Sequence, residues 1–144
     1  MTKNNLSVKT RAALPALLCL LALSFVSAAN ASQLDELLNR YQKLAGNPFS
    51  AQSGKTFWTT KHTPEAGKPA RSCADCHSAN LDNTGKHIRT GKIIKPMAPA
   101  ANPERLTDSR KMEKWLLRNC KWVLGRECSA QEKGDVLTFI KNFK

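Results

Sequence analysis

The sequence predicts an all-α fold, and three observations support this class. Apolar residues recur at helical spacing in separate segments, a capping-box sequence opens the last of these segments, and no segment alternates apolar and polar residues as a half-buried strand does. The middle of the chain, residues 64–103, has neither period. So long a loop is unusual in a chain of 144 residues unless it encloses a large bound group.

Residues 1–31 have the order of a cleaved signal peptide. A start with three basic residues leads into an apolar run, 12–26, and then into the small-residue site Ala29-Asn30-Ala31. The run is shorter than the roughly 20 residues that span a membrane. We therefore expect cleavage after Ala31, with Ala29 as the alternative. The mature domain, 32–144, is expected in the periplasm and not embedded in a membrane.

The first two helices are expected near the start of this domain. One apolar stripe consists of Leu34, Leu37, Leu38, Tyr41 and Leu44. Gly46 and Pro48 stop this helix, because neither residue suits a helix interior. A second, shorter helix is expected over residues 50–60.

Two further helices are expected at the C-terminal end. A cap at residues 107–109 precedes one apolar face, and Gly125 ends that helix. The face consists of Met112, Trp115, Leu116, Asn119 and Val123. Ser129 and Glu132 have capping-box spacing at the start of the last helix. Its predicted buried residues are Val136, Phe139, Ile140 and Phe143.

The mature domain carries a strong positive charge. Without the three basic residues of the signal segment, the domain contains 20 Lys and Arg and all 11 Asp and Glu, so its net charge is +9. These residues are spread from Arg40 to Lys144 and are not interleaved with stacking aromatics, so they do not indicate nucleic-acid binding. They favour encounter with an acidic redox partner, and simple solubility is the alternative.

Cys73-Ala74-Asp75-Cys76-His77 is a C-x-x-C-H sequence, which is typical of c-type haem attachment. The two thiols can each bind one vinyl group of a single haem, and the adjacent imidazole then becomes the proximal iron ligand. The long unpatterned middle of the chain and the export signal agree with one covalent haem c.

Three other interpretations of the motif are weaker. A thioredoxin-like pair needs a preceding strand, and residues 69–73 contain no apolar strand. A zinc site would combine Cys73 and Cys76 with Cys120 and Cys128, but the second pair is too widely spaced for a zinc module. A structural disulfide between Cys73 and Cys76 would not need His77.

The second iron ligand distinguishes an electron carrier from a ligand-binding protein. Five residues are possible: His62, His87, Met97, Met112 and Asn119. Met97 lies in a rigid proline-flanked loop but only 20 residues after His77, and Met112 is more simply a core residue. Asn119 is unusual because its carboxamide stands within an apolar stripe, where a lost hydrogen bond costs about 1–3 kcal/mol. A bond to backbone or to a propionate would also satisfy it.

Several segments together resemble the sphaeroides haem protein (SHP) type of class I cytochrome c. They are Thr90–Pro99, Asp108-Ser109, Glu113–Leu116, Arg118-Asn119-Cys120 and Gly125–Cys128, combined with C-x-x-C-H. The resemblance covers most of the mature chain. It implies a class I cytochrome c-like fold, with about four helices wrapped around one covalent haem.

The resemblance also implies site residues and partners. Asn119 takes the position of the family's distal ligand, and Cys120 and Cys128 take the positions of its disulfide. An amide is a weak ligand that should prefer ferric iron, so reduction would release Asn119 and open the haem to oxygen or nitric oxide. The implied electron donor is a dihaem cytochrome c with an acidic docking face. Met97 departs from the expected apolar residue.

Two other functions stay open at this point. One is a plain electron carrier with His77 and Met97 as its ligands and no substrate. The other is an enzyme that reduces oxygen or a nitrogen oxide at ferrous haem. The sequence identifies no distal acid or base, so it gives no ground to claim catalysis.

Overall fold

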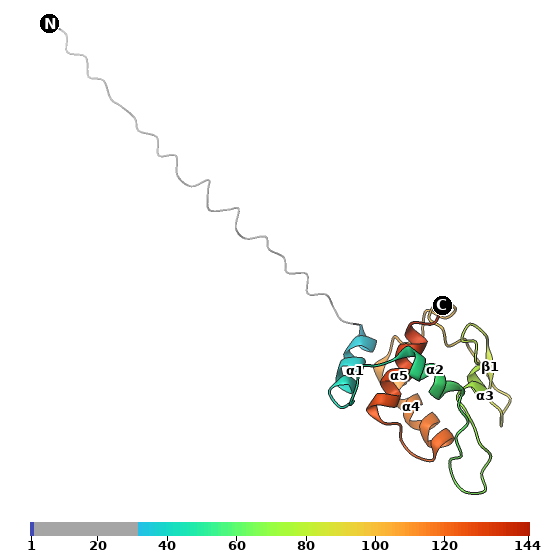
Figure 1. Ribbon diagram of the computed structural model, residues 1–144. Coiled ribbons are helices and arrows are strands. Elements are labelled where there is room, and N and C mark those ends of the chain that lie inside the picture. The colour runs from blue at the N-terminus through green and yellow to red at the C-terminus, as the bar shows by residue number, and fades with distance from the viewer. Residues whose placement is uncertain (2–31) are drawn as a thin grey trace. The chain divides into compact units, whose positions relative to one another are not determined.

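The computed structural model describes residue 1 and residues 32–144 (Figure 1). The predicted signal peptide lies outside the described residues except for Met1, and its cleavage stays a prediction. Among the described residues no helix is both long enough and apolar enough to cross a bilayer.

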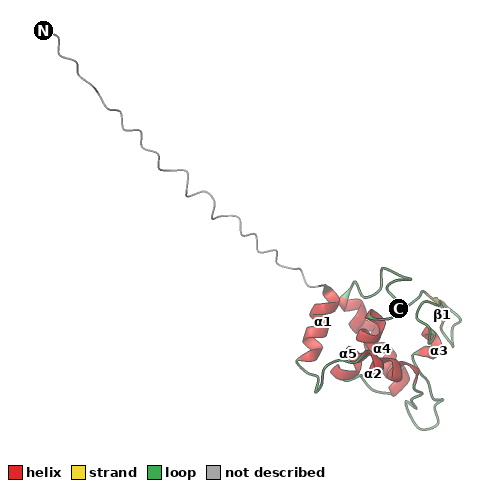
Figure 2. Cartoon of the chain, turned by 45° about the horizontal axis from the view of Figure 1, so that its top comes forward, coloured by secondary structure: helices red, strands yellow, loops and turns green. Residues whose placement is uncertain are grey.

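The predicted helices are all present in the domain (Figure 2). Their bounds are α1 Gln33–Gln42, α2 Ala51–Thr59, α4 Ser109–Leu124 and α5 Ala130–Lys141. The chain between α2 and α4 adds a short helix, α3, over Ala74–His77. It also adds an antiparallel pair of two-residue strands, β1 Gly85–Lys86 and β2 Ile93–Ile94. Elements this short leave no period in a sequence, so the middle of the chain was predictable only as loop.

The helix ends follow local chemistry. Ser32, Ser50, Asp108 and Ser129 each cap a helix, with a side-chain oxygen that accepts a backbone N–H. The predicted capping box between Ser129 and Glu132 is confirmed. Gly125 ends α4 in the left-handed conformation at φ 73°, as its position predicted.

The first apolar stripe was predicted one residue too long. Helix α1 ends at Gln42, and Leu44 is 79% exposed. The N–H groups of Leu44 and Ala45 both bond the carbonyl of Tyr41. The chain therefore turns before Leu44 can continue the buried face.

Helices α2 and α5 cross closely at the centre of the domain. A Cβ atom at Gly54 would overlap the backbone carbonyl of Asp135, so only glycine permits this approach. The core cluster around the crossing contains Trp58, Leu81, Val136, Phe139 and Ile140. A second cluster joins α1 to α4 and α5 through Leu37, Met112 and Leu137. These clusters fix the helices around the loops of residues 60–108.

Candidate haem site

One apolar cavity of about 470 Å³ lies between the middle loops and α4. Its lining includes most of the residues that the sequence singled out: Cys73, Cys76, His77, His87, Met97, Met112 and Asn119. The volume lies within the usual range of ligand and cofactor pockets, roughly 300–1,000 Å³. The fold therefore brings the attachment motif and four of the five candidate second ligands to one place.

Five cavity-lining residues, Ser72, Cys73, Cys76, His77 and Met97, come from the segments 72–81 and 96–98, and we call these two segments the attachment wall. The N–H of Ser72 bonds the Asp75 carboxylate at 2.8 Å, and Lys61 pairs with the same carboxylate. Behind α3, the indole N–H of Trp58 donates to the carbonyl of Ser78 at 2.8 Å. The short helix that carries the motif is thus held at both ends.

Backbone packing makes the attachment wall tighter still. A Cβ atom at Gly85 in β1 would overlap the carbonyl oxygen of Cys76. The N–H groups of Met97 and Ala98 both bond the carbonyl of Leu81 at 2.9 Å. Leu81 itself is fully buried. Met97 is therefore tied to the segment that begins with the attachment motif.

Arg105 braces the loop of Met97 from outside. Its guanidinium donates to the carbonyls of Pro96 and Lys95 at 2.8 and 2.7 Å. Burial lowers the pKa of Arg105. Sequence reasoning missed this residue, because a single arginine in a loop carries no recognisable signal.

His77 is held as a neutral imidazole. Burial, followed by the charges of Arg105 and His87, lowers its pKa to about 4. The rings of Trp58 and His77 lie 5.5 Å apart. Its Nδ1 is buried and makes no hydrogen bond to the residues that the structure describes. A neutral imidazole is the form that ligates a metal.

The cysteines of the motif lack the features of a redox pair. Cys73 and Cys76 are not bonded to each other. Burial raises the pKa of Cys73 to about 12, so its thiolate is disfavoured, unlike the low-pKa cysteine of a thioredoxin-like site. Cys120 is joined to Cys128 by a disulfide, so these two residues are unavailable for a zinc site with Cys73 and Cys76.

The cavity-lining residues of α4 form a second part of the lining, which we call the helix wall. They are Met112, Trp115, Leu116, Arg118, Asn119, Cys120, Trp122, Val123 and Leu124. Asn119 is half-buried, and its amide makes no side-chain hydrogen bond within residues 32–144. Trp115, predicted in the apolar stripe, is 50% exposed and lines the same cavity. The backbone partner considered for Asn119 is thus not found.

The other candidate ligands are distributed unevenly. Met112 is buried in the core cluster with Leu37 and also touches the cavity. His87 lines the cavity, and its Nδ1 accepts the N–H groups of Arg89 and Thr90. His62 does not line the cavity, and its ring lies 5.1 Å from that of Phe57.

Sequence reasoning also missed Trp122. Its ring lies 4.1 Å from the guanidinium carbon of Arg71 and 5.1 Å from that of Arg89. The three residues come from three separate segments of the chain, so no sequence motif could predict the cluster. Trp122 and Arg89 both line the cavity.

These residues fit a covalently attached haem. The cavity is mostly apolar, two thiols and a neutral imidazole lie on one wall, and an amide without a protein partner lies on the other. Cys73 and Cys76 would hold the group, and His77 and Asn119 would be the nitrogen and amide donors toward its iron.

The chain matches known proteins over most of its length. Residues 44–140 match the family described as a domain of unknown function, DUF1924. The cytochrome c-type protein SHP of Cereibacter sphaeroides is 43% identical over 106 residues, which cover 73% of this chain and 80% of that protein.

Two solved structures are similar to the fold. A structure of oxidized SHP, described as an oxygen-binding cytochrome c, has a TM-score of 0.69 and 39% identity, covering 76% of this chain and 96% of the other. The solution structure of cytochrome c'' from Methylophilus methylotrophus, whose description refers to haem-ligand detachment, has a TM-score of 0.65 and 34% identity, covering 77% and 94%.

Proposed function

The chain belongs to the family of SHP-type cytochromes c, and from this premise we propose that it is an exported monohaem cytochrome c that binds a small diatomic molecule when reduced. The haem supplies electron storage and a position for that ligand. Cys73 and Cys76 anchor the group, His77 is its proximal ligand, and Asn119 is its distal ligand in the oxidised protein. The observation that carries the proposal is the amide of Asn119, which makes no side-chain hydrogen bond within residues 32–144 and lines the same cavity as the attachment motif.

Asn119 is favoured over Met97 because of where each backbone is fixed. Met97 is hydrogen-bonded to Leu81, four residues after His77, and packs in the cluster that includes Cys73. A distal ligand must approach from the side opposite the proximal imidazole. Asn119 lies on the helix wall, which supports it for this role.

Asn119 is proposed to leave when the protein is reduced. A neutral amide is a weak donor that suits ferric better than ferrous iron, so its bond is the one that reduction weakens. The fixed attachment wall keeps His77 in place during this change. The Cys120–Cys128 disulfide holds the turn of α4 that carries Asn119, so the side chain can move while the helix stays.

Compartment and partner follow from the same proposal. Residues 1–31 are proposed as the signal that exports the protein to the periplasm, where a disulfide persists. The charge of +9 on residues 32–144 suits an acidic electron donor, and a dihaem cytochrome c is the proposed partner. SHP is described as oxygen-binding, so oxygen is the first ligand to test, with nitric oxide beside it.

The deciding experiment is the visible spectrum of the exported protein in both oxidation states, with and without carbon monoxide. We expect a six-coordinate ferric form and a ferrous form that binds carbon monoxide. A ferrous form that stays low-spin and ignores carbon monoxide would reject the release of Asn119. The plain carrier would then be the better description.

Two matched variants identify the ligand. Asn119→Ala should change the ferric spectrum to that of an open or water-ligated haem, while Met97→Leu should leave it unchanged. The opposite result would assign the distal position to Met97. Steady oxygen consumption under a constant electron supply would instead favour the enzyme.

A further inference from the structure

A second, open cleft of about 590 Å³ lies on the surface beside the haem cavity. Its lining is strongly basic: Lys68, Arg71, Arg89 and Lys121 face a single carboxylate, Glu65. Pro64, Trp122 and Gly125 complete it. We propose that this cleft is the docking site for an acidic electron-transfer protein, a proposal that rests on the haem function above.

The basic residues of the cleft have few partners of their own. Among residues 32–144, Lys68, Arg71 and Arg89 form no ion pair. Lys121 pairs only with the exposed Glu127, at 3.4 Å. Arg71 has one acceptor within the protein, the carbonyl of Trp122 at 3.5 Å. Carboxylates of a partner would supply the missing acceptors.

The cleft is a fixed feature rather than a chance gathering of mobile lysines. Arg71 lies on Trp122 at 4.1 Å and its backbone pairs with His62. A Cβ atom at Gly125 would overlap the carbonyl oxygen of Pro64, so the loop after α2 packs directly on the end of α4. Tryptophan and arginine held in this way are common at the centre of protein interfaces.

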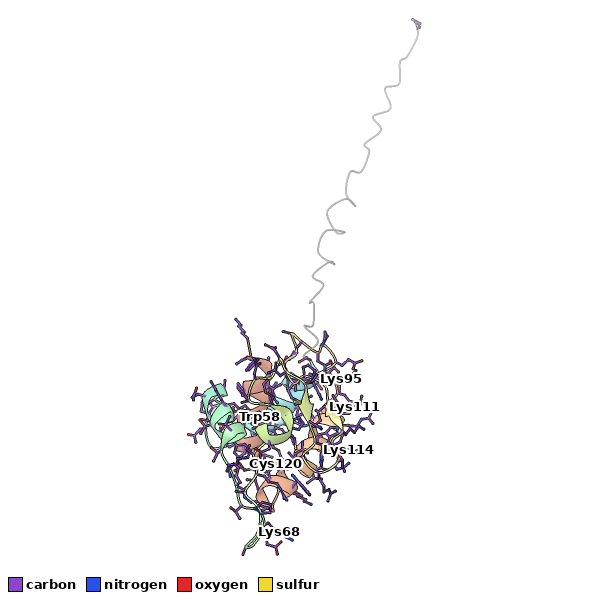
Figure 3. All side chains as sticks on the ribbon, turned by 90° about the vertical axis from the view of Figure 1, so that its right-hand side faces the viewer. Trp58, Lys68, Lys95, Lys111, Lys114 and Cys120 are labelled. Carbon is purple, nitrogen blue, oxygen red and sulfur yellow. A yellow bond between two sulfur atoms is a disulfide. The ribbon has the colours of Figure 1, made fainter. Side chains whose placement is uncertain are left out.

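The position of the cleft is what connects it to electron transfer. Trp122 and Arg89 line both the cleft and the haem cavity, so one layer of side chains separates them. A protein seated in the cleft would therefore lie beside the redox group. Basic residues elsewhere on the surface, such as Lys114, lie on other parts of the domain, away from the loop of Lys68 (Figure 3).

The test compares two double variants of the full exported protein. Lys68→Glu with Lys121→Glu reverses two exposed charges that line the cleft and do not line the haem cavity. Lys55→Glu with Lys114→Glu reverses two exposed lysines outside both. Both variants lower the net charge equally, so they separate a local site from general attraction.

The probe is an acidic flavodoxin, used for binding by NMR titration and for reduction of the protein by stopped flow. We expect backbone amide shifts at residues 65–68, 70, 71, 89 and 121–125. We also expect at least tenfold weaker binding and slower reduction in the cleft variant at low salt, and less than threefold change in the control. For the native chain, salt should weaken both.

Several results would overturn the docking site. Equal losses in both variants would mean general charge attraction, and shifts centred elsewhere would place the partner on another face. Binding to phosphatidylglycerol vesicles that only the cleft variant loses, with flavodoxin binding unchanged, would assign the cleft to a membrane surface. This test is independent of the carbon monoxide test, which can reject the release of Asn119 while flavodoxin still binds in the cleft. A protein that carries no haem but binds flavodoxin normally would reject the haem function and leave the binding site in place.

Discussion

The attachment wall and the helix wall close the same cavity by different means. On the attachment wall, backbone groups are paired, and β1 packs against Cys76 so closely that Gly85 has no room for a side chain. On the helix wall, α4 is fixed by its cap and by the Cys120–Cys128 disulfide, yet the amide of Asn119 makes no hydrogen bond within the described domain. The two walls thus differ in how far their cavity-lining groups are held by the rest of the protein.

Removing the anchors of the attachment wall should have the largest effect. Cys73→Ala combined with Cys76→Ala should abolish covalent haem, because both bonds to the group are lost. Haem staining of a denaturing gel measures this directly. Cys120→Ser with Cys128→Ser is the control and should keep the stain. A stained band for the first variant would contradict the assignment of the attachment residues.

The close packing behind the attachment wall predicts the next largest effect. Gly85→Ala should lower the free energy of unfolding by about 3 kcal/mol, because the added Cβ atom collides with the Cys76 carbonyl. Gly46→Ala is the matched control. A Cβ atom there meets nothing within 4 Å, so the change should stay within about 1 kcal/mol. Denaturant titration compares the unfolding midpoints of the two variants. Equal midpoints would show that the backbone around Cys76 can shift to accommodate a side chain at position 85.

The disulfide of the helix wall should matter somewhat less. Cys120→Ser with Cys128→Ser opens a loop of nine residues, which costs about 2.5 kcal/mol in the chain-entropy model. The midpoint of urea unfolding measures the loss. Faster binding of carbon monoxide by the reduced variant would show that the disulfide also restrains the part of α4 that carries Asn119. An unchanged midpoint would mean that packing alone holds the end of α4.

The smallest effect concerns the turn between α4 and α5. A hydrogen-bonded pair with Arg126, at 2.7 Å, lowers the pKa of Glu132 below its usual value. This pair therefore contributes stability above the unfolded pKa, and the contribution is lost as pH falls through the lower folded pKa. Glu132→Gln should cost about 0.5–1 kcal/mol at pH 7. Urea titrations at several pH values measure the difference in free energy of unfolding between Glu132→Gln and the native chain. This difference should shrink toward pH 3. A difference that does not change with pH would show that the charge of the Glu132 carboxylate does not contribute to stability.

Much of the fold could be predicted because its signals are local. The stripes, the caps at Asp108 and Ser129, and the glycine at position 125 act within one or two helical turns, so the sequence alone located four helices. Leu44 was misplaced because a turn after Tyr41 overrode the periodicity. The two short strands and α3 could not be predicted, because four or fewer residues do not form a pattern.

The site divides in the same way. Cys73, Cys76 and His77 stand out from their spacing, because one haem needs two thiols and an adjacent imidazole. Asn119 was conspicuous as a polar residue in an apolar stripe, and the family resemblance placed it at the position of the distal ligand. Its freedom from hydrogen bonds, and the tie between Met97 and Leu81, depend on neighbours distant in the chain.

The helices, the attachment motif and the positive charge follow from the amino-acid sequence, since each depends on residue type and spacing along one segment. Which residues meet depends on how distant segments pack in three dimensions. Trp122, Arg71 and Arg89 come together from segments up to 51 residues apart, as the bond from Arg71 to the carbonyl of Trp122 shows. Such contacts depend on how side chains pack across the whole domain, and this packing cannot be predicted from the residues of one segment.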